Sequence, residues 1–158
     1  MERAFEITLT VNGAAVTRRV EARTHLVDFL REELGLTGSH VACEHGVCGA
    51  CTLRVDGEIV RGCLMLAVQA DGCKVDTVEG LSDSKELERL QKAFHEKNAL
   101  QCGFCTPGML ITARDILQRY KRPDAQTVRH ELSGQICRCT GYANIVKAIV
   151  SAGQAWHG

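Results

Sequence analysis

Two groups of four cysteines constrain this chain more than any other feature of its sequence. The first group has the spacing C-x4-C-x2-C followed by a later single cysteine, which is the ligand spacing of plant-type 2Fe-2S ferredoxins. The second group consists of two close pairs that lie far apart in the sequence. The groups are Cys43, Cys48, Cys51 and Cys63, then Cys102, Cys105, Cys137 and Cys139. This pattern predicts two separate metal sites and a role in electron transfer.

Length and charge exclude several classes of protein. A chain of 158 residues is long enough for two small domains with thin cores. Metal binding can stabilise such domains, because the free energy of binding adds to the free energy of folding. Lys plus Arg and Asp plus Glu both total 19, so the net charge is zero. The chain therefore has no basic field that would attract nucleic acid or an anionic membrane.

The start of the chain and its apolar runs indicate the compartment. The first residues are polar, and no apolar run approaches the length of a membrane span. Without a secretory leader, the cysteines are expected to be reduced thiols or metal ligands rather than disulfides. We therefore expect a cytoplasmic protein with no membrane span. The ninth cysteine, Cys73, is expected to be a small hydrophobic residue or a free thiol.

Alternating apolar residues predict a strand-rich first domain, residues 1–78. Asn12-Gly13 and Asp56-Gly57 each separate two strand-like runs, which is the strongest short signal for a β-hairpin. Between the hairpins, Thr24 is the expected cap of a short helix. Residues 74–78 are expected to form one more strand. Strands around a single helix indicate a compact α+β unit.

The pattern changes to helical periodicity in the second domain, residues 79–158. Residues 79–84 are expected to form a short polar linker. Asp83 followed by Glu86 is typical of a capping box at the start of a helix. The apolar stripes that follow predict an all-α bundle of about four helices.

Three further helices are expected within this bundle. Thr106-Pro107 is a typical helix start, with a cap residue followed by a proline whose missing N–H is harmless in the first turn. Thr127 is the expected cap of a short helix. The last helix is expected over residues 143–156.

The first quartet lies in a glycine-rich loop that suits an anionic cluster. Gly46 and Gly49 allow the backbone to wrap closely and to turn its N–H groups toward thiolates. A zinc site favours paired C-x2-C units or histidines, and only Cys48 and Cys51 meet that pattern. The loop therefore favours iron over zinc.

The spacing of the second quartet leaves zinc open as an alternative. Cys102 and Cys105 form a zinc-like C-x2-C pair, whereas Cys137 and Cys139 are separated by one residue, which is poor geometry for a zinc knuckle. The neighbouring helix starts would add partial positive charge, which favours an anionic iron-sulfur cluster. Iron is thus favoured here too, but less strongly than at the first quartet.

Three motifs occur in a fixed order along the chain: Cys43-Glu44-His45-Gly46-Val47-Cys48-Gly49-Ala50-Cys51, Gln101-Cys102-Gly103-Phe104-Cys105-Thr106-Pro107-Gly108 and Cys137-Arg138-Cys139-Thr140-Gly141-Tyr142. With these motifs the chain resembles the iron-sulfur subunit of the molybdenum hydroxylase family, which includes xanthine oxidase, aldehyde oxidoreductases and aerobic carbon monoxide dehydrogenase. The resemblance covers essentially the whole chain. Glu44 stands where xanthine oxidase has glycine, which points to the bacterial branch with separate iron-sulfur, flavin and molybdenum polypeptides.

The resemblance implies a β-grasp 2Fe-2S ferredoxin-like domain followed by a four-helix-bundle 2Fe-2S domain. Each domain would hold one cluster with its four cysteines. By position, Gln101 matches the residue whose side chain approaches the pterin, and Cys139 matches the cluster ligand closest to it. Molybdopterin would belong to a large partner subunit and FAD to a medium one, in a heterotrimer or a doubled heterotrimer. The chain would then be part of an enzyme without catalytic residues of its own.

The function implied is to pass single electrons from the molybdenum centre through both clusters toward FAD. Arg138, between two ligands, is a candidate for raising the potential of the second cluster, and an ordinary surface or interface arginine is an equal alternative. A free-standing two-cluster ferredoxin-type carrier is the main alternative for the whole chain, and a zinc-stabilised structural module is the third. The remaining histidines share no spacing and are expected at the surface; they are His25, His40, His95, His130 and His157.

Overall fold

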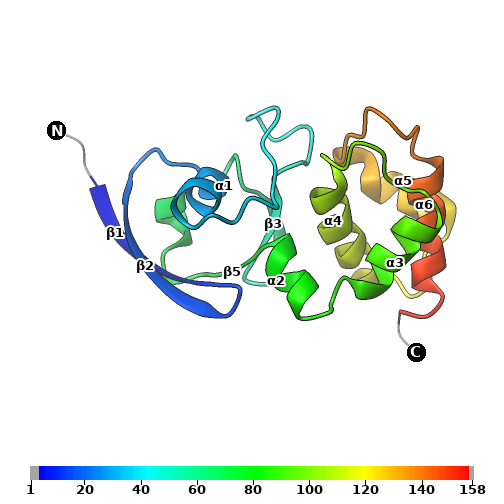
Figure 1. The fold of residues 1–158 in the computed structure, drawn as a ribbon, viewed down its shortest axis with the longest axis horizontal. Coiled ribbons are helices and arrows are strands. Elements are labelled where there is room, and N and C mark those ends of the chain that lie inside the picture. Colours follow the sequence, from blue (N-terminus) through cyan, green and yellow to red (C-terminus); the bar gives the residue numbers. More distant parts are fainter. Residues whose placement is uncertain (1–3, 157–158) are drawn as a thin grey trace.

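The computed structural model describes residues 4–156, so His157 lies outside the described part of the chain. A strand-rich unit and a helical unit lie side by side along the longest axis of the molecule (Figure 1). The amino-terminal strands are at one end of this axis, and the carboxy-terminal helix is in the other unit. Over the described residues, no helix has the length and apolar character needed to cross a membrane.

A five-stranded mixed sheet forms the strand-rich unit. Its strand order is β2-β1-β5-β3-β4. β1 and β5 are parallel, and the other neighbouring pairs are antiparallel. The last strand is shorter than expected, because Val78 already begins a helix. The strands are β1 (Ala4–Val11), β2 (Ala14–Glu21), β3 (Thr52–Val55), β4 (Glu58–Arg61) and β5 (Lys74–Asp76).

Both predicted hairpins are confirmed, and their turns explain why the short signal is reliable. Asn12 and Gly13 have φ angles of 49° and 83°. Asp56 and Gly57 have φ angles of 49° and 92°. Two successive residues with positive φ form a turn whose twist matches that of the flanking strands, and Asn, Asp and Gly adopt this conformation at low cost.

One helical segment packs across the sheet. The apolar residues between this segment and the sheet form the first core. The segment consists of α1 (Leu26–Asp28), continued by the π-helical turn η1 (Phe29–Glu33). Its apolar face packs on the sheet together with the 3₁₀ turn η2 (Ala67–Ala70). The expected cap at Thr24 is wrong: the helix starts after His25, and the carbonyl of Thr24 accepts a hydrogen bond from the Ala67 N–H (2.8 Å).

Four helices form the predicted bundle around a second core, and one more helix stands at the junction. Helix α2 contacts both β5 and α4, so it joins the two units. α4 is central and packs against α3 and α6 as well as against β3. The helices are α2 (Val78–Asp83), α3 (Glu88–Glu96), α4 (Thr106–Arg119), α5 (Ala125–Glu131) with the 3₁₀ turn η3 (Leu132–Gly134), and α6 (Ala143–Gly153).

The expectations for the junction are wrong in two respects. Residues 79–84 are not a linker but mostly belong to α2, which buries Leu81 in the second core. Asp83 and Glu86 do not form a capping box, since α3 begins at Glu88 and has no side-chain cap. The apolar face of α2 is a single turn long, which is too short for sequence periodicity to reveal.

Two predicted caps are also displaced from the true helix starts. Cys105 is the N-cap residue of α4, so Thr106 is its first helical residue. Asp124 caps α5 by accepting a hydrogen bond from the Thr127 N–H (2.7 Å). Asp is as good a cap as Thr, and the sequence offers both within one turn. α6 ends at Gly153, earlier than expected.

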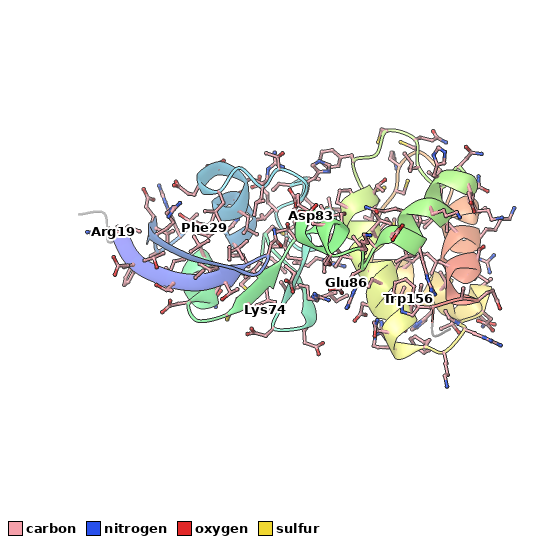
Figure 2. The ribbon with its side chains drawn as sticks, turned by 60° about the horizontal axis from the view of Figure 1, so that its bottom comes forward. Arg19, Phe29, Lys74, Asp83, Glu86 and Trp156 are labelled. Atoms are coloured by element: carbon pink, nitrogen blue, oxygen red, sulfur yellow. The ribbon has the colours of Figure 1, made fainter. Side chains whose placement is uncertain are left out.

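A partly buried ion network connects the two units. On β3, Arg54 donates to Asp76 (2.9 Å) and to Glu86 (3.0 Å), and Arg114 of α4 donates to Glu86 (2.7 Å). Figure 2 shows Glu86 between the strands and the helices. Burial raises the pKa of Glu86, but the guanidinium groups of Arg54 and Arg114 outweigh it and hold this pKa below its ordinary value. The carboxylate therefore stabilises the junction in its ionised form.

Candidate metal centres

The first quartet converges at the end of the sheet that faces the helices. Cys51 immediately precedes β3, and Cys63 follows β4, so the hairpin brings these two residues together. Both are 2% exposed and pack with Val27. Cys43 and Cys48 lie on the preceding loop and are half-buried. The four thiols thus come from one loop and the hairpin that follows it, so they all lie within one short segment of the chain.

Backbone N–H groups of the loop point at sulfur. The Cys48 N–H donates to Cys43 Sγ (3.4 Å). Hydrogen bonds from the Cys48 and His45 N–H groups lower the pKa of the Cys43 thiol to about 6. Burial raises the pKa of Cys51 to about 11. The environment of Cys43 therefore favours its thiolate form. The buried Cys51 would be a thiolate only beside a bound positive charge.

The second quartet converges between two loops at helix starts. Cys102 and Cys105 precede α4, and Cys137 and Cys139 lie between η3 and α6. Cys102 Sγ and Cys139 Sγ are 3.6 Å apart, and both residues are exposed. Cys105 is half-buried and Cys137 is buried. The tertiary packing of the bundle therefore unites two pairs that are distant in sequence.

Polar side chains shape the inner half of this second site. The Thr140 hydroxyl donates to Cys137 Sγ (3.1 Å), and the Cys137 N–H donates to the Tyr142 hydroxyl (3.0 Å). Burial raises the pKa of Cys137, but the Thr140 hydroxyl and nearby N–H groups outweigh it, so the pKa is lowered overall. Burial raises the pKa of Cys105 to about 12. The site thus combines a sulfur that favours the thiolate form with one that disfavours it.

The donor set at both sites fits an iron-sulfur cluster. All eight thiols are free. A backbone N–H donates to sulfur at the first site and a hydroxyl donates to sulfur at the second, which suits a cluster with net negative charge. Within residues 4–156, no three or more His, Cys, Asp or Glu side chains are arranged to hold a single metal ion.

The other predicted site residues lie at the outer edge of the second site. Gln101 and Arg138 are exposed, each next to an exposed cysteine in sequence. Cys73 belongs to the first core instead, where its Sγ lies 3.9 Å from the carbonyl oxygens of Gln69 and Asp71. This position agrees with the expected small hydrophobic residue.

Sequence reasoning missed the contacts that connect the two sites. The Ile136 N–H donates to the Cys48 carbonyl (2.8 Å), so a neighbour of one quartet bonds directly to a member of the other. His40, expected at the surface, is half-buried and stacks on Phe104 with ring centroids 4.5 Å apart. No sequence pattern predicts either contact. The only indication is that one residue of each contact lies in or next to a cysteine motif.

Family comparisons agree with this division into two sites. Residues 9–72 match the family described as "2Fe-2S iron-sulfur cluster binding domain", and residues 77–150 match the family described as "2Fe-2S binding domain". Together with the two thiol sites, these matches define an iron-sulfur electron-transfer protein with two clusters.

Relatives of known name match nearly the whole chain. Caffeine dehydrogenase subunit gamma of Pseudomonas sp. (strain CBB1) is 57% identical over 92% of this chain and 89% of its own length. The nicotine 6-hydroxylase small subunit of Paenarthrobacter nicotinovorans is 51% identical over 93% of this chain and 88% of its own. A solved chain of quinoline 2-oxidoreductase from Pseudomonas putida 86 has 50% identity and a TM-score of 0.91, covering 97% of this chain and 96% of that one.

The chain belongs to the family of iron-sulfur subunits of molybdenum hydroxylases. It is an electron-transfer subunit of a multi-subunit oxidoreductase. The predicted fold, a β-grasp 2Fe-2S domain followed by a helical 2Fe-2S domain, is confirmed, and the alternative of a free-standing carrier is not favoured.

Proposed function

We propose that each cysteine quartet holds one 2Fe-2S cluster, with residues 1–78 and 79–158 as the two cluster-binding domains. The observation that carries this proposal is that thiols from two distant parts of the sequence meet at the second site, where the sulfurs of Cys102 and Cys139 are 3.6 Å apart. The first site uses Cys43, Cys48, Cys51 and Cys63, and the second uses Cys102, Cys105, Cys137 and Cys139. When bound, each cluster exchanges one electron at a potential tuned by its surroundings.

The protein's own residues orient the ligands and exclude water. At the first site, loop N–H groups stabilise negative charge on Cys43, and Val27 covers Cys51 and Cys63. At the second site, Thr140 and Tyr142 fix Cys137 from the inside of the bundle. Because fixed dipoles surround the sulfurs, little reorganisation accompanies the gain or loss of an electron.

The exposed edge of the second site faces the electron source in our proposal. Gln101 would approach the pterin of the molybdenum cofactor, and Cys139 would be the ligand closest to it. Both residues are exposed, as are the sulfur of Cys102 and the side chain of Arg138. With both clusters bound, Cys102, Cys105, Cys137 and Cys139 would hold the group that receives electrons. Cys43, Cys48, Cys51 and Cys63 would hold the group that supplies them onward to FAD.

The complex we propose has three kinds of subunit. A large partner carries molybdopterin, a medium partner carries FAD, and this chain connects them in a heterotrimer, or in two copies of it, in the cytoplasm. The names of the relatives support this assembly, since they are called subunit gamma and small subunit. We further propose that the complex oxidises a nitrogen heterocycle, because these relatives and the solved enzyme are named for caffeine, nicotine and quinoline. Assays of the purified complex with heterocycles and with aldehydes test this substrate class.

Iron analysis of the purified complex tests the ligand assignment. We expect about four irons in this chain, no zinc, and two distinguishable paramagnetic signals after reduction. Cys63→Ser and Cys105→Ser should each remove one signal, and a different one. Cys73→Ser is the matched control and should retain both. Zinc in place of iron, a single signal in the wild type, or loss of iron in Cys73→Ser would contradict the assignment.

Two variants test the outer edge of the second site. Gln101→Ala should retain iron and both signals but slow the reduction of the second cluster by substrate, whereas Gln126→Ala, an exposed glutamine on α5, should not. Arg138→Ala should lower the potential of the second cluster if the charge tunes it. An unshifted potential would identify Arg138 as an ordinary surface or interface residue.

A further inference from the structure

A buried glutamine lies between the two metal sites. Gln135 is 2% exposed and directly follows η3. Its side-chain amide lies 2.9 Å from Thr52 Oγ1 of β3, 2.5 Å from Thr112 Oγ1 of α4 and 3.1 Å from the Gly49 carbonyl oxygen. Carbonyl oxygens do not donate hydrogen bonds, so the amide nitrogen faces Gly49 and the amide oxygen accepts from the Thr112 hydroxyl. The Thr52 hydroxyl donates its one proton to the same Gly49 carbonyl (2.7 Å). One side chain thus joins the first cysteine loop, the sheet and the bundle.

We call the contacts of Gln135 with Gly49, Thr52 and Thr112 the joint between the two sites. An arginine adds further hydrogen bonds to this joint. Arg61, the last residue of β4, donates from Nη1 to Thr52 Oγ1 (2.5 Å) and from Nη2 to the Gly134 carbonyl (2.7 Å). Its Nη1 also lies 3.2 Å from the amide oxygen of Gln135. Every polar atom of the Gln135 amide therefore has a partner, as burial requires.

Two glycines allow the surfaces to touch at this joint. A Cβ at Gly108, in the first turn of α4, would overlap the carbonyl oxygen of Gly49. A Cβ at Gly49 would overlap the Gln135 amide, and Gly49 also has a φ of +78°. Gly49 lies between Cys48 and Cys51, and Gly108 follows Cys105 by one helical turn. The first cysteine loop and the first turn of α4 are therefore in close backbone contact here.

A backbone hydrogen bond crosses the same joint. The Ile136 N–H donates to the Cys48 carbonyl (2.8 Å). Ile136 is covalently linked to Gln135 on one side and to Cys137 on the other. A continuous connection thus runs from Cys137 through the Ile136 backbone and one hydrogen bond to Cys48. Gly49 and Thr52, which contact the Gln135 side chain, both follow Cys48 in the sequence.

We propose that Gln135 is a positioning residue for electron transfer between the clusters. It acts by holding the Ile136–Cys48 hydrogen bond in place, and this bond forms the connection along which the electron passes. One electron leaves the second cluster, which is oxidised, and the first cluster is reduced by that electron; no covalent bond or proton is exchanged. The proposal rests on the ligand assignment proposed above.

Gln135→Glu in the assembled complex tests this role, because it preserves shape and replaces the N–H donor with an oxygen that repels the Gly49 carbonyl. We expect weaker magnetic coupling between the two reduced clusters in the paramagnetic spectrum, faster hydrogen exchange at the amide of residue 136, and roughly tenfold slower transfer between clusters after rapid reduction by substrate. Gln126→Glu, the same change at an exposed position, should alter none of these. Iron content should stay at the wild-type value.

Several outcomes separate the possible failures. A Gln135→Glu complex with full iron but unchanged coupling, exchange and transfer rate overturns the positioning role while the ligand assignment stands. If Gln135→Glu does not retain its iron, Thr112→Val decides, since it removes a single hydroxyl from the joint at nearly constant volume. In Thr112→Val, a partial loss of the magnetic coupling between the reduced clusters supports the proposal, and unchanged coupling overturns it. A wild-type complex with one signal contradicts the ligand assignment itself.

Discussion

The two metal sites are assembled in different ways. The first is built from one glycine loop and the hairpin that follows it, and its Cys51 and Cys63 are almost fully buried. The second is built from two loops that only the packing of α3, α4, α5 and α6 brings together, and its Cys102 and Cys139 are exposed. The first site therefore depends mainly on local chain conformation, and the second depends on the bundle core and has two exposed cysteines.

The largest expected effect comes from weakening one core at a time. Phe94→Ala in the bundle core should cost roughly 3–5 kcal/mol and separate the two cysteine pairs of the second site. Phe29→Ala is the matched change in the other core, and both residues are at most 1% exposed. We expect Phe94→Ala to lose the second paramagnetic signal and about half of the iron, and to keep the first signal. Loss of the first signal in Phe94→Ala would contradict the independence of the two sites.

Removal of metal should distinguish the sites in the isolated chain. An iron chelator can reach the sulfurs of Cys102 and Cys139 from solvent, whereas Cys51 and Cys63 are buried. We expect the second signal to disappear several times faster than the first. In the assembled complex, coverage by the partner should reduce this difference. Equal rates in the isolated chain would show that exposure does not govern the release of iron.

The ion network between the units should give a pH dependence to their junction. The pKa of Glu86 is lower in the folded chain than in the unfolded chain, so the unfolded state binds more protons between these two pKa values. The stabilisation is complete above the unfolded pKa and is lost as the pH falls through the folded value. Glu86→Gln should therefore destabilise the chain by about 1–2 kcal/mol near neutral pH and by less in acid. Thermal unfolding at several pH values measures this, and a pH-independent difference would contradict it.

The smallest expected effect concerns one end of a helix in the bundle. Asp124→Ala removes the side-chain cap of α5 and should lower the free energy of unfolding by a small amount. Asp83→Ala is the control, because Asp83 has the capping-box pattern in the sequence but caps no helix in the structure. Its effect should stay within about 0.5 kcal/mol. A larger effect of Asp83→Ala than of Asp124→Ala in chemical denaturation would reverse this assignment.

Local signals predicted the elements whose conformation depends on neighbouring residues. Asn12-Gly13 and Asp56-Gly57 identified both hairpins, since a turn of this type needs two positive φ angles in succession. The capping box at Asp83 failed because Glu86 is instead held by Arg54 and Arg114. Arg54 precedes Glu86 by 32 positions, so no local pattern could reveal their contact.

The sequence alone determined that this chain has two sets of four thiols, two structural units and an iron-sulfur function. Thiol type, spacing and glycine content are local properties, and they limit which metal groups a loop can hold. Only the tertiary structure decided how the sets relate to one another. Gln135, Thr52 and Thr112 meet at the joint between the sites, although Thr52 and Gln135 are separated by 83 positions. Their contact depends on how β3 packs against α4, and that packing results from burial of both cores rather than from any local signal.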